Sequence, residues 1–338
     1  MKGSKSVYIV AELSANHNHK IEIAQKTIIA AKESGADAIK LQTYTADTLT
    51  IQCNNEYFKI KGGLWDGYTL YDLYKESYTP WEWHEELFDY ARSIGIDIFS
   101  TPFDKSAVDF LEKLNPPYYK IASFEIVDIP LIEYAASKGR PMIISTGIAT
   151  LTDIEEAINA CRRVGNNEIK LLKCTSSYPA PIEEANLLTI PNMKDTFKVD
   201  VGLSDHTMGS SVSIAAVALG AKVIEKHFIL DRKLGGPDSA FSMEPDEFKF
   251  MVKSIREVEK ALGKVTYELT DKVKNNKIFA RSLFIVEDVK KGDTVTSENV
   301  RSIRPGYGIH PKYYKEILGK RFTKKYKKGT PLNWEIIV

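Results

Sequence analysis

The fold is decided by the stretch Gly202-Leu-Ser-Asp-His-Thr-Met-Gly-Ser-Ser-Val-Ser-Ile-Ala-Ala-Val-Ala-Leu-Gly-Ala-Lys-Val-Ile-Glu-Lys-His-Phe228. Its pattern predicts a strand, an alanine-rich helix and a second strand, with His206 and His227 at the two strand ends. Because side chains alternate along a strand, Ser204 shares a side with His206, and Glu225 shares a side with His227. Two imidazoles and a carboxylate then converge, which suits a divalent metal beside a substrate. Either histidine alone is explained equally well as a hydrogen-bonded residue at a strand end, but the matched pair favours a site.

The same strand and helix rhythm runs through most of the chain. Strands are expected near 7–12, 37–42, 96–101, 117–122, 141–146, 169–175, 199–205 and 221–227. Helices are expected at 21–35, 81–94, 104–115, 128–139, 152–165, 182–196 and 209–219. Eight such units over about 260 residues predict a (β/α)8 TIM barrel, in the α/β class. The rival is a doubly wound open sheet, but no glycine-rich dinucleotide motif follows the first strand.

Composition indicates an ordinary globular protein. Of 338 residues, 43% are hydrophobic and 27% are charged, and no run of about 18 apolar residues is present. Residues 1–6 lead directly into an apolar strand without the hydrophobic region of a signal peptide, so we expect a cytoplasmic protein with no membrane partner. The cysteines are three and widely spaced, at Cys53, Cys161 and Cys174, so neither disulfides nor zinc knuckles are expected.

We expect three parts in the chain: a barrel domain at 1–263, a charged linker at 264–280 and a small β-rich domain at 281–338. The last part carries 13 Lys and Arg against 6 Asp and Glu, a net charge of +7. Such a charge suits nucleic acid, docking on the acidic body, an anionic substrate or simply a solvated face. Because basic and aromatic residues are hardly interleaved there, no nucleic-acid partner is expected.

One connection is unusually long. Residues 43–80 follow the second predicted strand and are rich in tyrosine, with Phe58 and Trp65 in addition. Long loops at the catalytic face of a barrel commonly cover or select a substrate. About half of these aromatic side chains are expected to pin the loop to the barrel instead.

Polar side chains stand at the carboxyl ends of the other predicted strands. These are Glu12, Lys40, Gln42, Thr101, Lys120, Ser123, Ser145 and one of Lys173 or Thr175. An interior lysine is costly without an anionic partner, so Lys40 and Lys120 with nearby hydroxyls predict a site for phosphate and carboxylate groups. The alternative for Lys120 is a structural salt bridge to Glu125 or to another carboxylate of the barrel.

Many motifs, in order along the chain, resemble the sialic acid synthase family. They are Ala11-Glu-Leu-Ser-Ala-Asn-His-Asn18, Lys40-Leu-Gln-Thr43, Ser100-Thr-Pro-Phe103, Tyr119-Lys-Ile-Ala-Ser123, Ser145-Thr-Gly147, Gly202-Leu-Ser-Asp-His-Thr207, Glu225-Lys-His-Phe228 and Gly236-Pro-Asp-Ser239. The run Arg301-Ser-Ile-Arg-Pro-Gly-Tyr-Gly308 is similar to that family's antifreeze-like (SAF) domain. Within the family, Gly63-Leu-Trp-Asp-Gly67, Ser123-Phe-Glu-Ile126 and Tyr307-Gly-Ile-His-Pro311 look most like the bacterial pseudaminic acid branch.

The resemblance implies a reaction between phosphoenolpyruvate and an N-acetylated amino sugar in its open aldehyde form, with release of phosphate. For the pseudaminic branch this sugar is 2,4-diacetamido-2,4,6-trideoxy-L-altrose. It also implies a domain-swapped homodimer, in which Arg304 of one subunit reaches the active site of the other.

By position, the resemblance assigns a role to each matching residue. Phosphoenolpyruvate-binding positions are Lys40, Thr101, Lys120, Ser123, Ser145, Ser176 and Ser204, where Ser176 replaces an asparagine common in the sialic acid branch. Sugar-side positions are Gln42, Tyr178, Asp238 and Arg304. His206 and His227 correspond to the ligands of one divalent metal ion, for which mixed nitrogen and oxygen ligation favours Mn²⁺, Co²⁺ or Mg²⁺.

The catalytic carboxylate is expected to be Glu12 or Glu225, with Glu12 preferred because it stands near the rim where the sugar arrives. Two other functions stay open at this point. A metal-dependent aldolase would use pyruvate and release no phosphate. A non-enzymatic carbohydrate-binding or nucleic-acid-binding protein is favoured only by the basic C-terminal part.

Overall fold

The computed structural model describes residues 6–338 and divides the chain into two compact units, one up to Gly263 and one at Lys264–Val338. Residues 1–5, part of the segment inspected for a signal peptide, lie outside the described residues. In the part of the chain that the structure covers, no helix combines the length and apolar character needed to cross a membrane.

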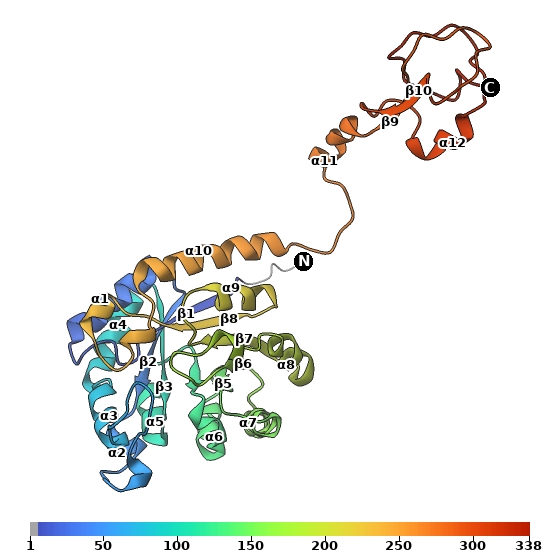
Figure 1. Ribbon diagram of the computed structural model, residues 1–338. Coiled ribbons are helices and arrows are strands. Elements are labelled where there is room, and N and C mark those ends of the chain that lie inside the picture. The colour runs from blue at the N-terminus through green and yellow to red at the C-terminus, as the bar shows by residue number, and fades with distance from the viewer. Residues whose placement is uncertain (1–5) are drawn as a thin grey trace. The chain divides into compact units, whose positions relative to one another are not determined.

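The first unit is a closed barrel of eight parallel strands, as the sequence predicts (Figure 1). Every strand pairs with the next, and the first also pairs with the last. The strands are β1 (Tyr8–Glu12), β2 (Ala38–Thr43), β3 (Asp97–Pro102), β4 (Tyr119–Ile121), β5 (Met142–Ser145), β6 (Ile169–Cys174), β7 (Asp200–Asp205) and β8 (Val223–His227). The prediction of a TIM barrel is therefore confirmed.

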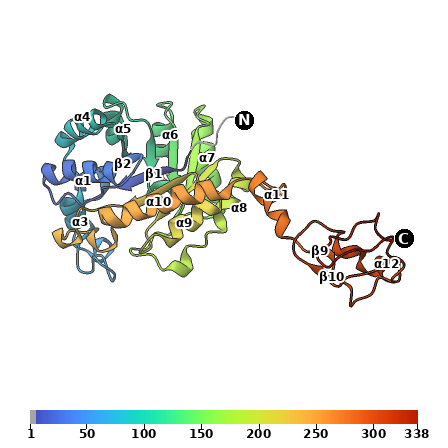
Figure 2. The same ribbon diagram turned by 90° about the horizontal axis from the view of Figure 1, so that it is seen from above.

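Helices surround the barrel, and the view from above shows α10 lying along it (Figure 2). They are α1 (Ile21–Glu33), α4 (His84–Ile94), α5 (Lys105–Lys113), α6 (Ile129–Ala136), α7 (Leu151–Arg163), α8 (Thr189–Phe197), α9 (Ser211–Ala218) and α10 (Pro245–Leu262). The helix predicted at 182–196 is wrong in its first half. A 3-10 turn at Ile182–Glu184 comes first, and Asn186 then takes a left-handed conformation with φ 43° that breaks the helix.

Two apolar clusters form the core of this unit. The larger lies between strands and helices and includes Ile9, Phe88 and Ile144. The smaller consists of Val10, Ala38, Phe99, Ile143, Leu172 and Val223, which are buried together. Five of these six lie two positions before a predicted site residue, and Leu172 lies two positions before Cys174, so each points to the inner side of its strand. They fill the barrel beneath the polar strand ends, so a packed apolar layer supports the site from below.

The connection between β2 and α4 is more ordered than a plain loop. It contains α2 (Ala46–Leu49), a 3-10 turn at Glu56–Phe58 and α3 (Leu70–Ser77). Thr45 caps α2 and Thr69 caps α3, since each side chain accepts a hydrogen bond from a backbone N–H of the first turn. Short capped helices give this connection a defined inner face.

The second unit has a small core of its own. Its antiparallel pair consists of β9 (Ser282–Ile285) and β10 (Val300–Ile303), and its helices are α11 (Asp271–Asn275) and α12 (Tyr314–Ile317). Leu283, Val300, Phe322 and Leu332 are among the buried residues that pack together. A unit of this size with so few regular hydrogen-bonded elements depends on that cluster for its stability.

Candidate active site

Four charged side chains meet inside the barrel and form what we call the charged floor: Glu12, Lys40, Lys120 and Glu225. Lys40 Nζ lies 2.9 Å from Glu12 Oε2 and 3.1 Å from Glu225 Oε1. Lys120 Nζ lies 3.6 Å from the same Glu225 oxygen. All four side chains are almost fully buried, so each charge depends on its neighbours rather than on water. The salt bridge considered for Lys120 is therefore present, with Glu225 as the barrel carboxylate, whereas a pair with Glu125 is not observed among the described residues.

The surroundings of the charged floor give its two carboxylates different pKa values. Burial raises the pKa of Glu12 to about 7, although Lys40 partly opposes this effect. Burial also disfavours ionised Glu225, but Lys120 and Lys40 outweigh it and lower the pKa of that carboxyl. Burial lowers the pKa of Lys120, whereas the two carboxylates overcome burial at Lys40 and raise its pKa. Of the two carboxylates in the charged floor, Glu12 is thus the one that changes protonation near neutral pH, as a proton-transfer residue must.

Hydroxyl groups surround this floor. Thr101 Oγ1 and Ser145 Oγ are buried and find no hydrogen-bond partner among the residues that the structure describes. Ser204 Oγ donates to Glu225 Oε1 at 3.0 Å, and the backbone N–H of Gly147 donates to Ser123 Oγ at 3.1 Å. Unpartnered buried hydroxyls beside two lysines are the groups expected to bind phosphate or carboxylate oxygens.

Gly147, in the loop after β5, lies very close to two serine hydroxyls of the site. A Cβ placed on Gly147 would lie 2.0 Å from Ser176 Oγ and 2.7 Å from Ser123 Oγ. Both distances are far below van der Waals contact. The backbone therefore approaches the two hydroxyls only because residue 147 has no side chain.

His206 and His227, at the ends of β7 and β8, lie close together. The ring centroids of His206 and His227 lie 5.3 Å apart. Between β7 and β8, on the opposite side of these strands, Lys226 Nζ donates to Asp205 Oδ2 at 2.9 Å and to the Thr207 carbonyl at 2.6 Å. This buried pair ties together the two strand ends that carry the histidines.

The residues present fit a divalent metal with open coordination positions. His206 Nδ1 lies 3.0 Å from the Thr175 carbonyl, so a proton on Nδ1 leaves Nε2 as a free ligand atom. Its pKa is raised, because the Cys174 thiol at 3.7 Å outweighs burial. Burial lowers the pKa of His227 well below its ordinary value, and its buried Nδ1 has no hydrogen-bond partner within residues 6–338.

The donor set does not suit a closed metal centre, in which protein side chains supply every ligand. In the described part of the chain, no three His, Cys, Asp or Glu side chains form a cluster able to hold a metal ion. His227 Nδ1 and Asp238 Oδ2 are 3.8 Å apart, which is too far for a shared hydrogen bond. The donor set therefore suits an ion held by two histidines and completed by water or substrate, as catalytic sites with open positions require.

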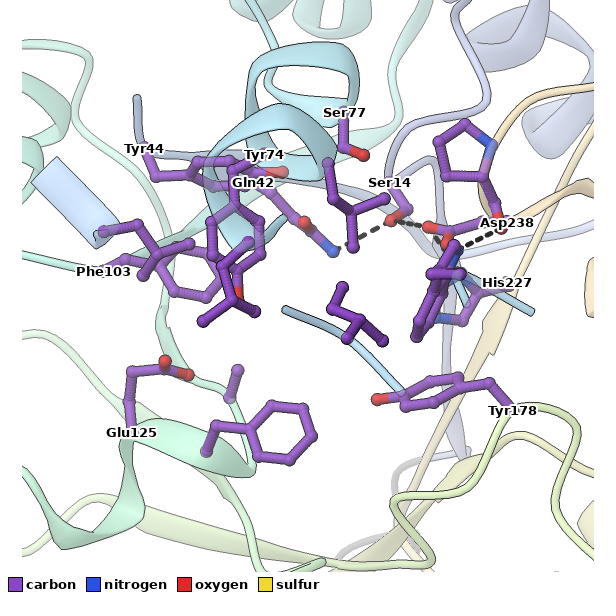
Figure 3. A pocket seen from close by; sticks show the side chains of 18 residues that line it. Ser14, Gln42, Tyr44, Tyr74, Ser77, Phe103, Glu125, Tyr178, His227 and Asp238 are labelled. Carbon is purple, nitrogen blue, oxygen red and sulfur yellow. Dashed lines mark hydrogen bonds and ion pairs between the residues drawn. The ribbon is translucent and has the colours of Figure 1, made fainter. Parts of the chain in front are cut away.

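A chain of hydrogen bonds runs from the charged floor to residues predicted to lie on the sugar side, and Figure 3 shows its part from Gln42 through Ser14 to Asp238. Gln42 Nε2 donates to Glu12 Oε1 at 3.1 Å and to Ser14 Oγ at 2.9 Å. Ser14 Oγ in turn donates to Asp238 Oδ2. This chain fixes the orientation of Gln42 and Asp238, two residues for which a sugar-side position is predicted.

An open cavity of about 390 Å³ lies beside these residues. Its lining includes Ser14, Gln42, Tyr44, Leu49, Ile60, Trp65, Leu70, Leu73, Tyr74, Phe103, Glu125, Tyr178, His227 and Asp238. The Tyr178 ring packs against His206, with centroids 4.4 Å apart, and against Trp65 at 5.7 Å. A cavity of this size accommodates a small ligand rather than a polymer.

Nearly all the predicted site residues thus gather at one end of the barrel. Arg304 is the exception, because it belongs to the second unit, where it is exposed. Lys173, one of the alternatives at the end of β6, is only half-buried and donates to Thr175 Oγ1 at 2.8 Å.

Three residues of the site escaped the sequence analysis: Ser14, Gly147 and, as a site residue, Glu125. Ser14 has a left-handed φ of 48°, so strand alternation from Glu12 does not describe where its side chain points. Glu125 lines the cavity with Oε2 unpartnered among described atoms, and burial raises its pKa to about 7. Its signal was a carboxylate two residues after Ser123, in a loop at the catalytic face of the barrel.

Comparison with known proteins gives a consistent result. The NeuB family model matches residues 27–267, and the SAF domain model matches residues 280–338. A pseudaminic acid synthase of Helicobacter pylori is 51% identical over 96% of this chain and 96% of its own length. An N,N'-diacetyllegionaminic acid synthase of Legionella pneumophila is 39% identical over 99% of this chain and 95% of its own. The crystal structure of an N-acetylneuraminic acid synthetase of Leptospira borgpetersenii matches with a TM-score of 0.73 and 31% identity, covering 81% of this chain and 91% of that one.

Proposed function

Because this chain belongs to the NeuB family, we propose that it is a pseudaminic acid synthase. The reaction condenses phosphoenolpyruvate with 2,4-diacetamido-2,4,6-trideoxy-L-altrose and yields pseudaminic acid and phosphate. One observation carries the proposal: two buried lysines, with hydroxyls that find no partner among the described residues, lie at the same end of the barrel as two histidines, and the chain is 51% identical to a pseudaminic acid synthase of Helicobacter pylori. The enzyme would work in the cytoplasm, where phosphoenolpyruvate is produced.

Phosphoenolpyruvate carries a carboxylate and a phosphate, and both need cations. Lys40 and Lys120 supply two positive charges, and Thr101 and Ser145 supply hydroxyl donors that have no partner among the described residues. Ser123, Ser176 and Ser204 complete the proposed set. Binding exchanges the present lysine–carboxylate pairs for lysine–substrate pairs, so part of the binding energy compensates for separating charges within the floor.

The bond-forming step joins C3 of phosphoenolpyruvate to the aldehyde carbon of the sugar. His206 and His227 would hold one divalent ion, with Mn²⁺, Co²⁺ and Mg²⁺ as candidates. When bound, such an ion supplies Lewis acidity to the aldehyde and to a water molecule. Attack moves the π electrons of the aldehyde onto its oxygen, which takes up a proton, and leaves positive charge at C2. Water adds at C2 and gives up a proton. The C2–O bond to phosphate then breaks as the new C2 hydroxyl loses its proton and becomes the keto group, and phosphate departs.

We assign to Glu12 the role of the base that accepts a proton from that water. Its raised pKa, about 7, leaves the carboxylate basic enough to accept a proton near neutral pH. Glu225 has the lowered pKa and remains ionised as the partner of both lysines. Replacement of Glu12 by Gln should abolish turnover and leave phosphoenolpyruvate binding nearly intact, while unchanged turnover would reject the assignment.

A homodimer in which Arg304 completes the partner's site is the second part of the proposal. Exposed apolar side chains stand in four consecutive loops after β4, β5, β6 and β7. They are Phe124, Ile148, Leu151, Ile182, Leu188 and Met208. An apolar rim at the catalytic end of a barrel suits a protein contact. Mixing inactive Arg304→Ala and His227→Ala chains should restore activity in mixed dimers, and no recovery would argue that Arg304 acts within its own chain.

The alternatives differ in sugar or in chemistry. A synthase of N-acetylneuraminic or legionaminic acid would use the same site with another N-acylated sugar. A metal-dependent aldolase would use pyruvate instead. Incubating the enzyme and the altrose derivative with phosphoenolpyruvate or with pyruvate, in Mn²⁺ or in EDTA, separates these chemistries. We expect phosphate release only with phosphoenolpyruvate and Mn²⁺. A product from pyruvate without phosphate would overturn the proposal.

A further inference from the structure

Helix α3 presents one face to the cavity. Leu70, Leu73, Tyr74 and Ser77 all line it, and their spacing of three and four residues is that of one side of an α-helix. Leu73 is buried, and the other three are half-buried, so part of this face is accessible to a ligand. The leucines occupy the first turns of the face, where the helix contributes only hydrocarbon to the cavity.

Two further aliphatic side chains extend this surface. Leu49 is the last residue of α2, which packs against α3, and it also lines the cavity. Ile60 precedes α3 and donates its backbone N–H to the Tyr68 carbonyl at 2.8 Å, which brings it to the start of the helix. We call Leu49, Ile60, Leu70 and Leu73 the aliphatic wall. All four come from the single connection between β2 and α4.

An aliphatic wall is unusual for a sugar. A hydroxyl buried against leucine and isoleucine loses its hydrogen bonds to water and gains none, which is unfavourable. A methyl group in the same place is stabilised by its removal from water. The polar lining residues Ser14, Gln42 and Asp238 are instead joined to one another and to the charged floor. The cavity therefore suits a ligand that presents polar groups to these residues and an apolar group to the aliphatic wall.

We propose that the aliphatic wall selects the substrate by binding a terminal methyl group where an ordinary hexose carries a hydroxymethyl group. This inference rests on the proposed function, since it takes the aldehyde end of the sugar to lie at His227, Asp238 and Gln42. The wall, which lines the same cavity, is then left for the part of the sugar that carries no hydrogen-bonding group. Acetamido groups do not suit the wall, because their N–H and C=O groups require partners. The wall thus makes the enzyme specific for 6-deoxy sugars.

The test compares two sugars that differ by one hydroxyl group. They are 2,4-diacetamido-2,4,6-trideoxy-L-altrose and its 6-hydroxy counterpart, each given with saturating phosphoenolpyruvate while phosphate release is followed. An apolar pocket discriminates against an added hydroxyl by about 10²-fold in kcat/KM. We expect this preference for the 6-deoxy sugar in the wild type. A ratio near one would overturn the inference, whereas phosphate release with neither sugar would overturn the proposed function instead.

Two variants locate the discrimination in the wall. Leu70→Asn places an amide against the sugar, and Ile60→Thr introduces a hydroxyl while it keeps the branched shape. Both should lower the 6-deoxy preference at least tenfold. The matched control is Leu64→Asn, because Leu64 lies in the same connection but is exposed and absent from the cavity lining. Its preference should equal that of the wild type. An unchanged preference in both wall variants would contradict the proposal, and Ile60→Thr decides the matter if Leu70→Asn does not fold.

Discussion

The charged floor and the connection between β2 and α4 serve one cavity in opposite ways. The floor consists of buried charges on strands, whose register fixes where each side chain lies. The connection consists of half-exposed apolar and aromatic side chains on short capped helices. The floor is satisfied by its own ion pairs, whereas the aliphatic wall is left partly uncovered. In the proposed mechanism, reaction chemistry therefore depends on the strands, and substrate choice depends on a segment that can vary without disturbing them.

The floor should be the more sensitive region, and Lys40→Met tests this most severely. The variant leaves Glu12 and Glu225 facing each other without the cation that lies within 3.1 Å of both. Removing one partner of a buried pair costs about 3–5 kcal/mol of stability. We also expect turnover to fall by about 10³-fold or more, since a substrate-binding cation is lost. Urea unfolding and phosphate release measure the two effects, and turnover within tenfold of wild type would refute the role of Lys40.

Gly147→Ala should produce the next largest effect, confined to phosphoenolpyruvate. The new methyl group would collide with Ser176 Oγ and Ser123 Oγ and displace both hydroxyls. We expect the KM for phosphoenolpyruvate to rise about 10²-fold, as loss of two charge-assisted hydrogen bonds implies, while the KM for the sugar changes little. The double variant Gly147→Ala/Ser176→Ala removes one collision and should recover part of the loss. Equal damage to both KM values would show that the loop after β5 does not separate the two substrates.

The pH dependence follows from Glu12. Burial raises its pKa from 4.5 to about 7, so the folded protein holds a proton between these values that the unfolded chain has lost. Its contribution to stability is full below pH 4.5 and is lost as the pH rises towards 7. Turnover that requires the ionised base behaves in the opposite way, and should fall about tenfold per pH unit below 7.

Glu125 provides the control for this pH profile, because burial raises its pKa to about 7 as well. Glu125→Gln should keep the acidic limb of the kcat profile, whereas Glu12→Gln should be inactive at every pH. If Glu125→Gln removes the limb and Glu12→Gln remains active, the two carboxylates have exchanged roles.

Trp65→Phe should have the smallest effect and belongs to the connection. Trp65 Nε1 donates to the Pro237 carbonyl at 3.0 Å, and this bond links the connection to the loop that carries Asp238. Loss of one such hydrogen bond costs about 1 kcal/mol, so the KM for the sugar should rise about fivefold. The KM for phosphoenolpyruvate should stay within twofold. A larger effect on phosphoenolpyruvate would mean that the connection and the floor are not independent.

Strand alternation explains why most of the charged floor was predictable from the sequence. Glu12, Lys40, Lys120 and Glu225 all lie on strands, where a period of two decides which side chains point inward. The helix predicted at 182–196 was wrong in part, because the left-handed turn at Asn186 leaves little trace in the hydrophobic pattern.

The cavity wall was less accessible to prediction. Residues 43–80 stood out by length and tyrosine content, yet the leucines that line the cavity depend on where α2 and α3 begin and how they pack. Glu125 lies on a 3-10 turn after β4, to which neither the strand period nor the helix period applies. Side chains on such turns require coordinates before a role can be assigned.

The most direct test offers phosphoenolpyruvate and Mn²⁺ with each of three sugars and measures phosphate release. The sugars are 2,4-diacetamido-2,4,6-trideoxy-L-altrose and the precursors of N-acetylneuraminic acid and of N,N'-diacetyllegionaminic acid. We predict the highest kcat/KM with the altrose derivative and no release after addition of EDTA. Faster release with either of the other sugars, or release that EDTA does not stop, would contradict the proposed function.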